Sequence, residues 1–200
     1  FYKIIYIQSY EQKIMAKMFK TIIRGIFKLI YGRVEFDNNI NYSTISSEIN
    51  KYNNETKSDQ KYFLYSSNNC RIYTDLNENV AVIKDRIILN GHSYQQINGK
   101  LESVEKNSVL KNGTPYFKKK INGTILNLLQ GSSGENYFHF MFDVLPKLWL
   151  VESKMNFENI DFFLLNKKID WQIKILKIIG INPNKILSAK HYRHIEATRI

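Results

Sequence analysis

Apolar and cationic residues separate at helical spacing between residues 11 and 33. The apolar positions recur three and four apart, at Ile14, Met15, Met18, Phe19, Ile22, Ile23, Ile26, Phe27 and Ile30. The cationic positions fall on the other side of the helix, at Lys13, Lys17, Lys20, Arg24 and Lys28. This pattern predicts that residues 1–36 form a basic amphipathic helix region.

The apolar face of this helix has two interpretations. It could dock on the rest of the protein, as the apolar faces of most amphipathic helices do. Alternatively, residues 11–33 could lie on an anionic membrane surface, because no acidic residue occurs from Gln12 to Arg33 and cations flank the apolar face. Periodicity alone does not decide between a protein and a membrane partner.

The middle of the chain changes from a polar segment to short strands. Residues 37–60 are rich in Asn, Ser and charged residues and have no sustained apolar period, which predicts a polar linker. Short apolar runs then predict strands at 62–65, 71–73, 80–83 and 86–89. The turn signals Asn90-Gly91 and Asn98-Gly99 indicate antiparallel hairpins in this part of the chain.

After Gly123 the pattern alternates between strand and helix. Strands are predicted at 125–129, 160–165 and 186–187, and helices at 136–154 and 171–179, with Gly180 as a C-cap. Repeated strand–helix units predict an α/β fold with a parallel sheet and right-handed crossovers. Pro146 lacks a backbone N–H, so the first helix should kink or restart near it.

Three polar residues share one face of that first helix. Asn136, His139 and Asp143 are three and four apart, and apolar neighbours are free to pack beside them: Tyr137, Phe138, Phe140, Met141 and Val144. The preceding Gly/Ser loop, residues 131–134, offers N-cap hydroxyls. Because ligands of open α/β sheets bind beyond the carboxyl ends of the strands, the polar face should border a binding crevice.

Residues 136–148, NYFHFMFDVLPKL, resemble the signature of glycosyltransferase family 61, which includes capsular polysaccharide biosynthesis glycosyltransferases. Members of that family resemble this segment in the order and spacing of an Asn, a residue pair, a His, three residues, an Asp and a Leu-Pro. The likeness extends over about residues 70–200, although only this motif is specific. Phe140 stands where the family commonly has Trp, and Lys147 where it commonly has Arg.

The resemblance implies a fold and an activity. Residues 61–200 would be the N-terminal, acceptor-side domain of a glycosyltransferase B type fold, a Rossmann-like half with a β-hairpin-rich lead-in, incomplete at its C-terminus. A second half would hold the donor. The enzyme would move a sugar from a nucleotide sugar to a hydroxyl of a glycan acceptor, in surface or capsular polysaccharide synthesis, with no essential metal or other cofactor.

Sugar transfer requires a base for the acceptor proton and groups that hold the acceptor in line. His139 is the expected base, with Asp143 holding its imidazole, while Asn136, Ser133 and Gly134 are expected to bind substrate. The opposite assignment, with Asp143 as base and His139 orienting, stays open. A structural alternative is that Asn136 caps the helix, His139 is a satisfied buried histidine and Asp143 pairs with Lys147.

Composition narrows the partners and the location. The net charge of +11 could indicate nucleic-acid binding, but the cations are dispersed, and Lys118, Lys119 and Lys120 are expected to be a solvated run, so no nucleic acid is predicted. The single Cys70 excludes an intrachain disulfide, which agrees with a cytoplasmic protein. The membrane interpretation of residues 11–33 would place this protein peripherally at the inner membrane face. The rival function is a non-catalytic, membrane-associated carbohydrate-binding or scaffold module.

The remaining histidines do not suggest a metal site. His92, His191 and His194 lack a second ligand at metal-binding spacing. His191 and His194 are instead expected at the surface.

Overall fold

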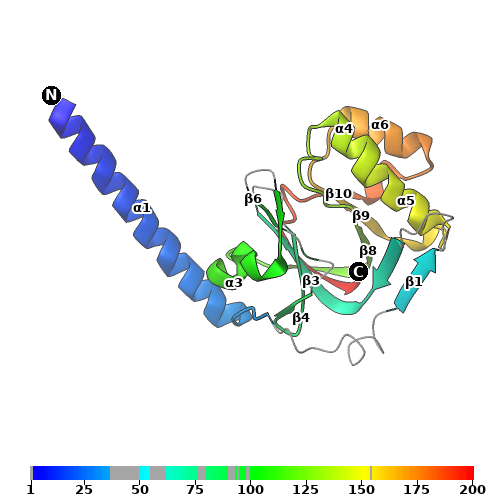
Figure 1. Cartoon of the computed structure of the whole chain (residues 1–200), viewed down its shortest axis with the longest axis horizontal. Coiled ribbons are helices and arrows are strands. Elements are labelled where there is room, and N and C mark those ends of the chain that lie inside the picture. Colours follow the sequence, from blue (N-terminus) through cyan, green and yellow to red (C-terminus); the bar gives the residue numbers. More distant parts are fainter. Residues whose placement is uncertain are drawn as a thin grey trace.

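A computed structural model describes residues 2–36, 50–54, 62–75, 80–89, 93, 95–97, 100–153 and 155–200. The first element is helix α1, Tyr2–Tyr31, which extends away from a body built around one sheet (Figure 1). The apolar periodicity of residues 11–33 predicted this helix, and the observed helix begins nine residues before that segment. No helix among the described residues has the length and apolarity needed to cross a bilayer.

The body contains a mixed sheet of seven strands in the order β10-β9-β8-β11-β3-β4-β5. The parallel part consists of β8 (Lys119–Asn127), β9 (Phe162–Leu165), β10 (Ile186–Ser188) and β11 (His194–Arg199). The antiparallel part consists of β3 (Asn68–Thr74), β4 (Val80–Lys84) and β5 (Ile87–Ile88). The predicted α/β class is confirmed, but the predicted parallel sheet is a parallel stretch of one mixed sheet, which also contains the antiparallel strands.

Helices α4 (Tyr137–His139), α5 (Leu145–Glu152) and α6 (Asp170–Ile178) gather beside β8, β9 and β10 (Figure 1). The packing comes from one apolar core that joins Leu148 of α5 and Leu176 of α6 to buried residues of β9 and β10, together with Phe140 and Val144 between α4 and α5. Two 3-10 turns, Phe157–Asn159 and Pro183–Lys185, lead into β9 and β10. Gly180 follows α6 with a φ of +90°, as expected of a residue after a helix end.

Smaller elements cover the antiparallel end of the sheet. Strands β6 (Gln95–Ile97) and β7 (Lys100–Glu102) form a hairpin, and a 3-10 turn, Val104–Lys106, leads to α3 (Ser108–Asn112). Val104 and Val109 pack with Tyr73, Ala81 and other buried residues of β3 and β4. The Asn98-Gly99 turn between β6 and β7 and the Asn90-Gly91 turn lie outside the described residues.

Part of the predicted linker has backbone structure. β1, Asn50–Asn54, pairs antiparallel with β2, Tyr62–Ser66, in a two-stranded sheet. The polar composition did not predict this strand, because strands pair through backbone hydrogen bonds, which need no apolar side chains. The rest of the linker lies outside the described residues.

Candidate functional site

The polar motif begins where the loop after β8 enters α4. The Asn136 side-chain oxygen accepts a hydrogen bond from the His139 backbone N–H at 3.3 Å, so Asn136 is the N-cap. The prediction that a Gly/Ser-loop hydroxyl caps this helix is therefore wrong. Because Asn136 is exposed and its amide nitrogen has no hydrogen bond within the described part of the chain, that nitrogen can still meet a ligand.

Ser133 and Gly134, predicted to bind substrate, are held inside the protein. The Ser133 hydroxyl is buried and donates to the Gln130 carbonyl at 2.9 Å. The Gln172 amide of α6 donates to the carbonyls of Ser133 and Gly134, at 2.9 and 3.3 Å. These hydrogen bonds hold the loop in place, so that it supports the motif rigidly.

His139 and Asp143 lie in contact on the same side of the helix. The His139 Nδ1 atom is 2.7 Å from an Asp143 carboxylate oxygen, and the two side chains are 37% and 36% exposed. An ionised carboxylate only accepts hydrogen bonds, so Nδ1 carries the proton when the imidazole is neutral. Nε2 then has a free lone pair and no hydrogen-bond partner among the described residues. His139 and Asp143, which were predicted to share one face of the helix, are thus in contact, and His139 is not a buried histidine.

A wide helical turn links this pair to α5. Residues Phe140–Val144 form one π-helical turn, and the Leu145 N–H bonds to the Phe140 carbonyl five residues back. The helix then restarts as α5 with Pro146 in its first turn, as predicted from the missing N–H of proline. Single π-turns inside helices occur frequently at functional sites, so this one marks the motif independently of its residue types.

The partly buried Lys147 makes no ion pair with Asp143, contrary to the alternative raised from spacing. Its ammonium donates to the Leu129 carbonyl at 3.2 Å and to the Gln130 side-chain oxygen at 2.7 Å. Burial lowers the pKa of Lys147 to about 8, while the charge of Asp143 acts in the opposite direction. A cation with such a lowered pKa near the histidine–aspartate pair is typical of functional sites.

The apolar neighbours divide between the core and the surface. Phe140 and Val144 are buried and Met141 is partly buried, as predicted. Tyr137 and Phe138 were expected to pack but are 61% and 60% exposed, and the Tyr137 ring contacts the partly buried Trp171 ring with centroids 5.3 Å apart. The histidine–aspartate pair therefore stands in an exposed aromatic surface.

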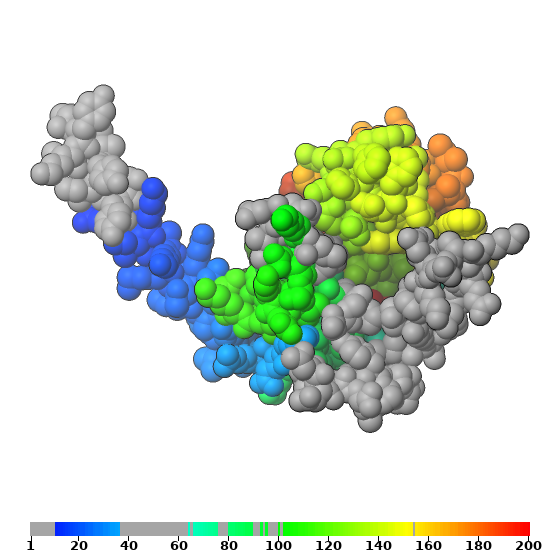
Figure 2. Space-filling model, in the orientation of Figure 1, coloured from blue at the N-terminus to red at the C-terminus, as the bar shows by residue number. Residues whose placement is uncertain are grey.

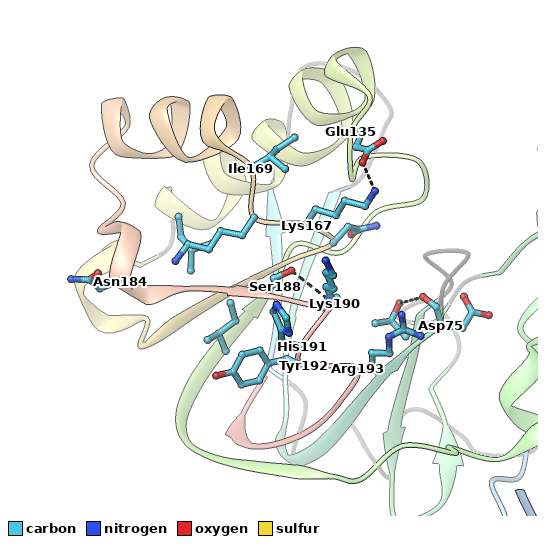
Figure 3. A pocket seen from close by; sticks show the side chains of 16 residues that line it. Asp75, Glu135, Lys167, Ile169, Asn184, Ser188, Lys190, His191, Tyr192 and Arg193 are labelled. Atoms are coloured by element: carbon cyan, nitrogen blue, oxygen red, sulfur yellow. Dashed lines mark hydrogen bonds and ion pairs between the residues drawn. The ribbon is translucent and has the colours of Figure 1, made fainter. Parts of the chain in front are cut away.

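A cavity of about 870 Å³ lies next to the start of the motif. Glu135, the residue before Asn136, lines it and forms an ion pair with Lys167, another lining residue (Figure 3). The other lining residues were missed as a group because the cavity joins loops that are distant in sequence: 166–169 and 189–193. Lys167-Lys168 and Lys190 to Arg193 are basic runs at strand ends, which is the signal that could have indicated them.

Two of the remaining histidines have different surroundings. His191 is exposed and lines the cavity, but His194 is only 1% exposed, so the surface prediction is wrong for it. His194 is the first residue of the central strand β11 and stacks edge-on against Tyr31 and Tyr73. The described residues contain no group of three or more His, Cys, Asp or Glu that could hold a metal ion.

Comparisons with protein-family models, curated proteins and solved structures find no match to this chain. The resemblance to glycosyltransferase family 61 therefore rests on the motif residues themselves and stays a prediction.

Proposed function

We propose that the chain is the acceptor-side part of a glycosyltransferase that moves a sugar from a nucleotide sugar to a glycan hydroxyl, in surface or capsular polysaccharide synthesis. The contact between His139 and Asp143 is the observation that carries this proposal. A base with a free lone pair, held by a carboxylate and open to solvent, is what deprotonation of an acceptor hydroxyl requires. The spacing of the motif, which resembles family 61, supplies the reaction class.

The geometry favours His139 over Asp143 as the base. The nearer carboxylate oxygen of Asp143 is occupied by Nδ1 of the imidazole, whereas Nε2 of His139 faces away from that bond. Asp143 would hold the tautomer and stabilise the imidazolium that forms when the proton is taken. The exposed amide nitrogen of Asn136, one turn earlier, would donate to the acceptor.

The strand order supports a Rossmann-like half. In chain order, β8, β9, β10 and β11 take the arrangement 3-2-1-4, with β8 as the first strand. This arrangement matches the start of the doubly wound fold, in which ligands bind at the carboxyl ends near the point where the order reverses. The motif begins where the loop after β8 enters α4, next to the loop at which that fold binds its ligand. A second half would contribute the nucleotide-sugar site.

We further propose that α1 associates with an anionic membrane surface. Its apolar side chains are exposed, for example Met15, Phe19 and Leu29 at 64%, 65% and 88%, whereas Phe27 near its end is buried. The described part of α1 stands clear of the body except near its C-terminal end (Figure 2). The body therefore leaves most of the apolar face uncovered, which favours a partner other than this domain.

The transfer reaction can be tested in a protein that contains this chain together with the expected second half. A panel of nucleotide sugars and glycan acceptors is screened for sugar transfer. We expect His139→Ala to lower turnover by about a hundredfold. The control Glu152→Gln removes an exposed charge on α5 and should leave turnover unchanged. Glycan binding without transfer from any donor would instead support the non-catalytic, membrane-associated binding module.

A further inference from the structure

The cavity beside the motif has the position and size of a small-molecule site. It lies beyond the ends of β9 and β10 and is bounded by the loops 166–169 and 189–193, with Thr74 and Asp75 from the end of β3 (Figure 3). Its volume of about 870 Å³ falls within the usual range of ligand pockets, roughly 300–1,000 Å³. The candidate base and its carboxylate do not line it.

Positive charge predominates in the lining. Four cationic side chains and two carboxylates face the cavity, an excess of two positive charges: Lys167, Lys168, Lys190 and Arg193 against Asp75 and Glu135. One opposite pair cancels locally, because Lys167 and Glu135 are 2.5 Å apart. The excess therefore belongs to the side chains on the floor and the opposite wall, where a ligand would carry negative charge.

The cations differ in how firmly they are held. The Arg193 guanidinium donates to the Tyr116 hydroxyl at 2.7 Å and stacks on its ring, and the Lys168 ammonium donates to the Pro183 carbonyl at 3.2 Å. The Lys190 ammonium has no partner among the described residues, and its side chain extends from the floor toward Lys167 (Figure 3). An ammonium that faces open space in this way is stabilised by an anion bound beside it.

The floor beneath these charges is apolar. Ile186, Leu187 and Ala189 are buried lining residues, and the Tyr192 side chain stands at one side (Figure 3). A ligand that combines a charged end with a compact body can therefore satisfy both parts of the lining, because pockets orient ligands with few polar groups over an apolar surface.

We propose that this cavity binds a phosphorylated sugar, with the phosphate between Lys190 and the loop 166–169 and the sugar ring over the apolar floor. A phosphate monoester carries close to two negative charges at neutral pH, which matches the excess of two, and ammonium groups bind phosphate as point charges. A carboxylate of an acidic sugar would neutralise only half of that excess. The site is separate from the histidine–aspartate pair and does not depend on the proposed transferase activity.

Calorimetric titration of the 200-residue chain at low salt tests this site with glucose 1-phosphate, glucose, glucuronate and uridine diphosphate. We expect glucose 1-phosphate to bind at least about tenfold more tightly than glucose or glucuronate. Lys190→Gln should weaken that binding about tenfold, which corresponds to about 1.4 kcal/mol. Lys168→Gln should act in the same direction. The matched control is Lys174→Gln, an exposed lysine of α6 that does not line the cavity.

Three outcomes would overturn the proposal. Glucose 1-phosphate could bind no better than glucose, Lys174→Gln could weaken binding as much as Lys190→Gln, or uridine diphosphate could bind more tightly than the sugar phosphate. The last result would identify a nucleotide site. His139→Ala should leave all these affinities unchanged, so failure of this site and failure of the transferase proposal are distinguishable.

Discussion

The two ends of the Asn136 amide have different surroundings. The oxygen caps the helix by accepting from the His139 N–H, whereas the nitrogen is exposed with no hydrogen bond in the described residues. Capping and substrate binding are therefore compatible roles for one side chain, although they appeared as alternatives in the sequence. The two roles can be separated, because an aspartate caps a helix as well as an asparagine but has no amide donor.

Asn136→Asp should keep the melting temperature near that of the wild type and raise the apparent KM for the acceptor more than it lowers kcat. Asn136→Ala should also raise KM, and in addition lower the free energy of unfolding by about 1 kcal/mol through loss of the cap. Steady-state kinetics with thermal melts of both variants measure these effects. A normal KM in Asn136→Asp would leave Asn136 with the capping role alone.

His194 should make stability depend on pH. Burial lowers its pKa to about 4, partly opposed by the Tyr116 carbonyl 2.9 Å from Nδ1. Between that value and the unfolded pKa of about 6.5, the unfolded chain binds more protons, so stability falls as the pH decreases through this window. The loss reaches about 3 kcal/mol near pH 4, at about 1.4 kcal/mol for each pKa unit.

Urea unfolding of the wild type and of His194→Gln at several pH values between 7 and 4 measures this dependence. Carboxylates such as Glu196, whose pKa is lowered chiefly by its hydrogen bond with Lys118, also lose stability in acid. They do so in both proteins, so the difference between the two isolates His194. Equal slopes in wild type and variant would show that His194 does not titrate as its surroundings indicate.

At the scale of elements, the C-terminal end of α1 is part of the body. The Tyr31 hydroxyl accepts from the Lys118 N–H at 2.9 Å, Phe27 packs edge-on against Phe117, and the Lys28 ammonium donates to the Lys111 carbonyl at 2.7 Å. Deletion of residues 11–33 would remove these contacts with the body as well as the exposed apolar face. Point substitutions farther along the helix test the membrane proposal without disturbing the body.

The intact chain should sediment with vesicles rich in anionic lipid and be released by added salt, because salt screens the attraction of exposed lysines to the lipid charge. The double substitution Phe19→Ser with Ile22→Ser removes two side chains that are 65% and 59% exposed and should abolish sedimentation. Lys84→Gln, a change on the sheet, is the control. Absence of sedimentation would contradict the membrane proposal and favour a protein partner for the face of α1. Equal sedimentation with neutral vesicles would contradict the proposed preference for anionic lipid.

Local patterns predicted most elements but not all of their details. The helix at α1, the strands β2, β3, β4 and β9, and the restart near Pro146 follow from periodicity and from the chemistry of proline. The π-turn and the buried ammonium of Lys147 did not, because both depend on how the helix packs against the end of β8. Spacing placed His139 and Asp143 on one face, and their contact required only that local geometry.

At the scale of the whole molecule, the strand order depends on contacts between distant segments. β11 lies between β8 and β3, and Arg71 of β3 contacts His194 of β11 at 3.4 Å. No segment from 194 to 199 was predicted as a central strand, since its pairing partners are about 75 and 125 residues away along the chain. This insertion completes the 3-2-1-4 order and brings the loops around the cavity together.

The central claim is that His139 and Asp143 act as one unit in proton transfer. The most direct test is the turnover of His139→Ala, Asp143→Ala and the double variant, in a protein that contains this chain and transfers sugar, with thermal melts of each. We predict that each single change lowers turnover about a hundredfold or more, and that the double change costs little beyond the worse single one. Variants that melt early yet turn over normally per folded molecule would contradict the claim, as would single effects that multiply in the double variant.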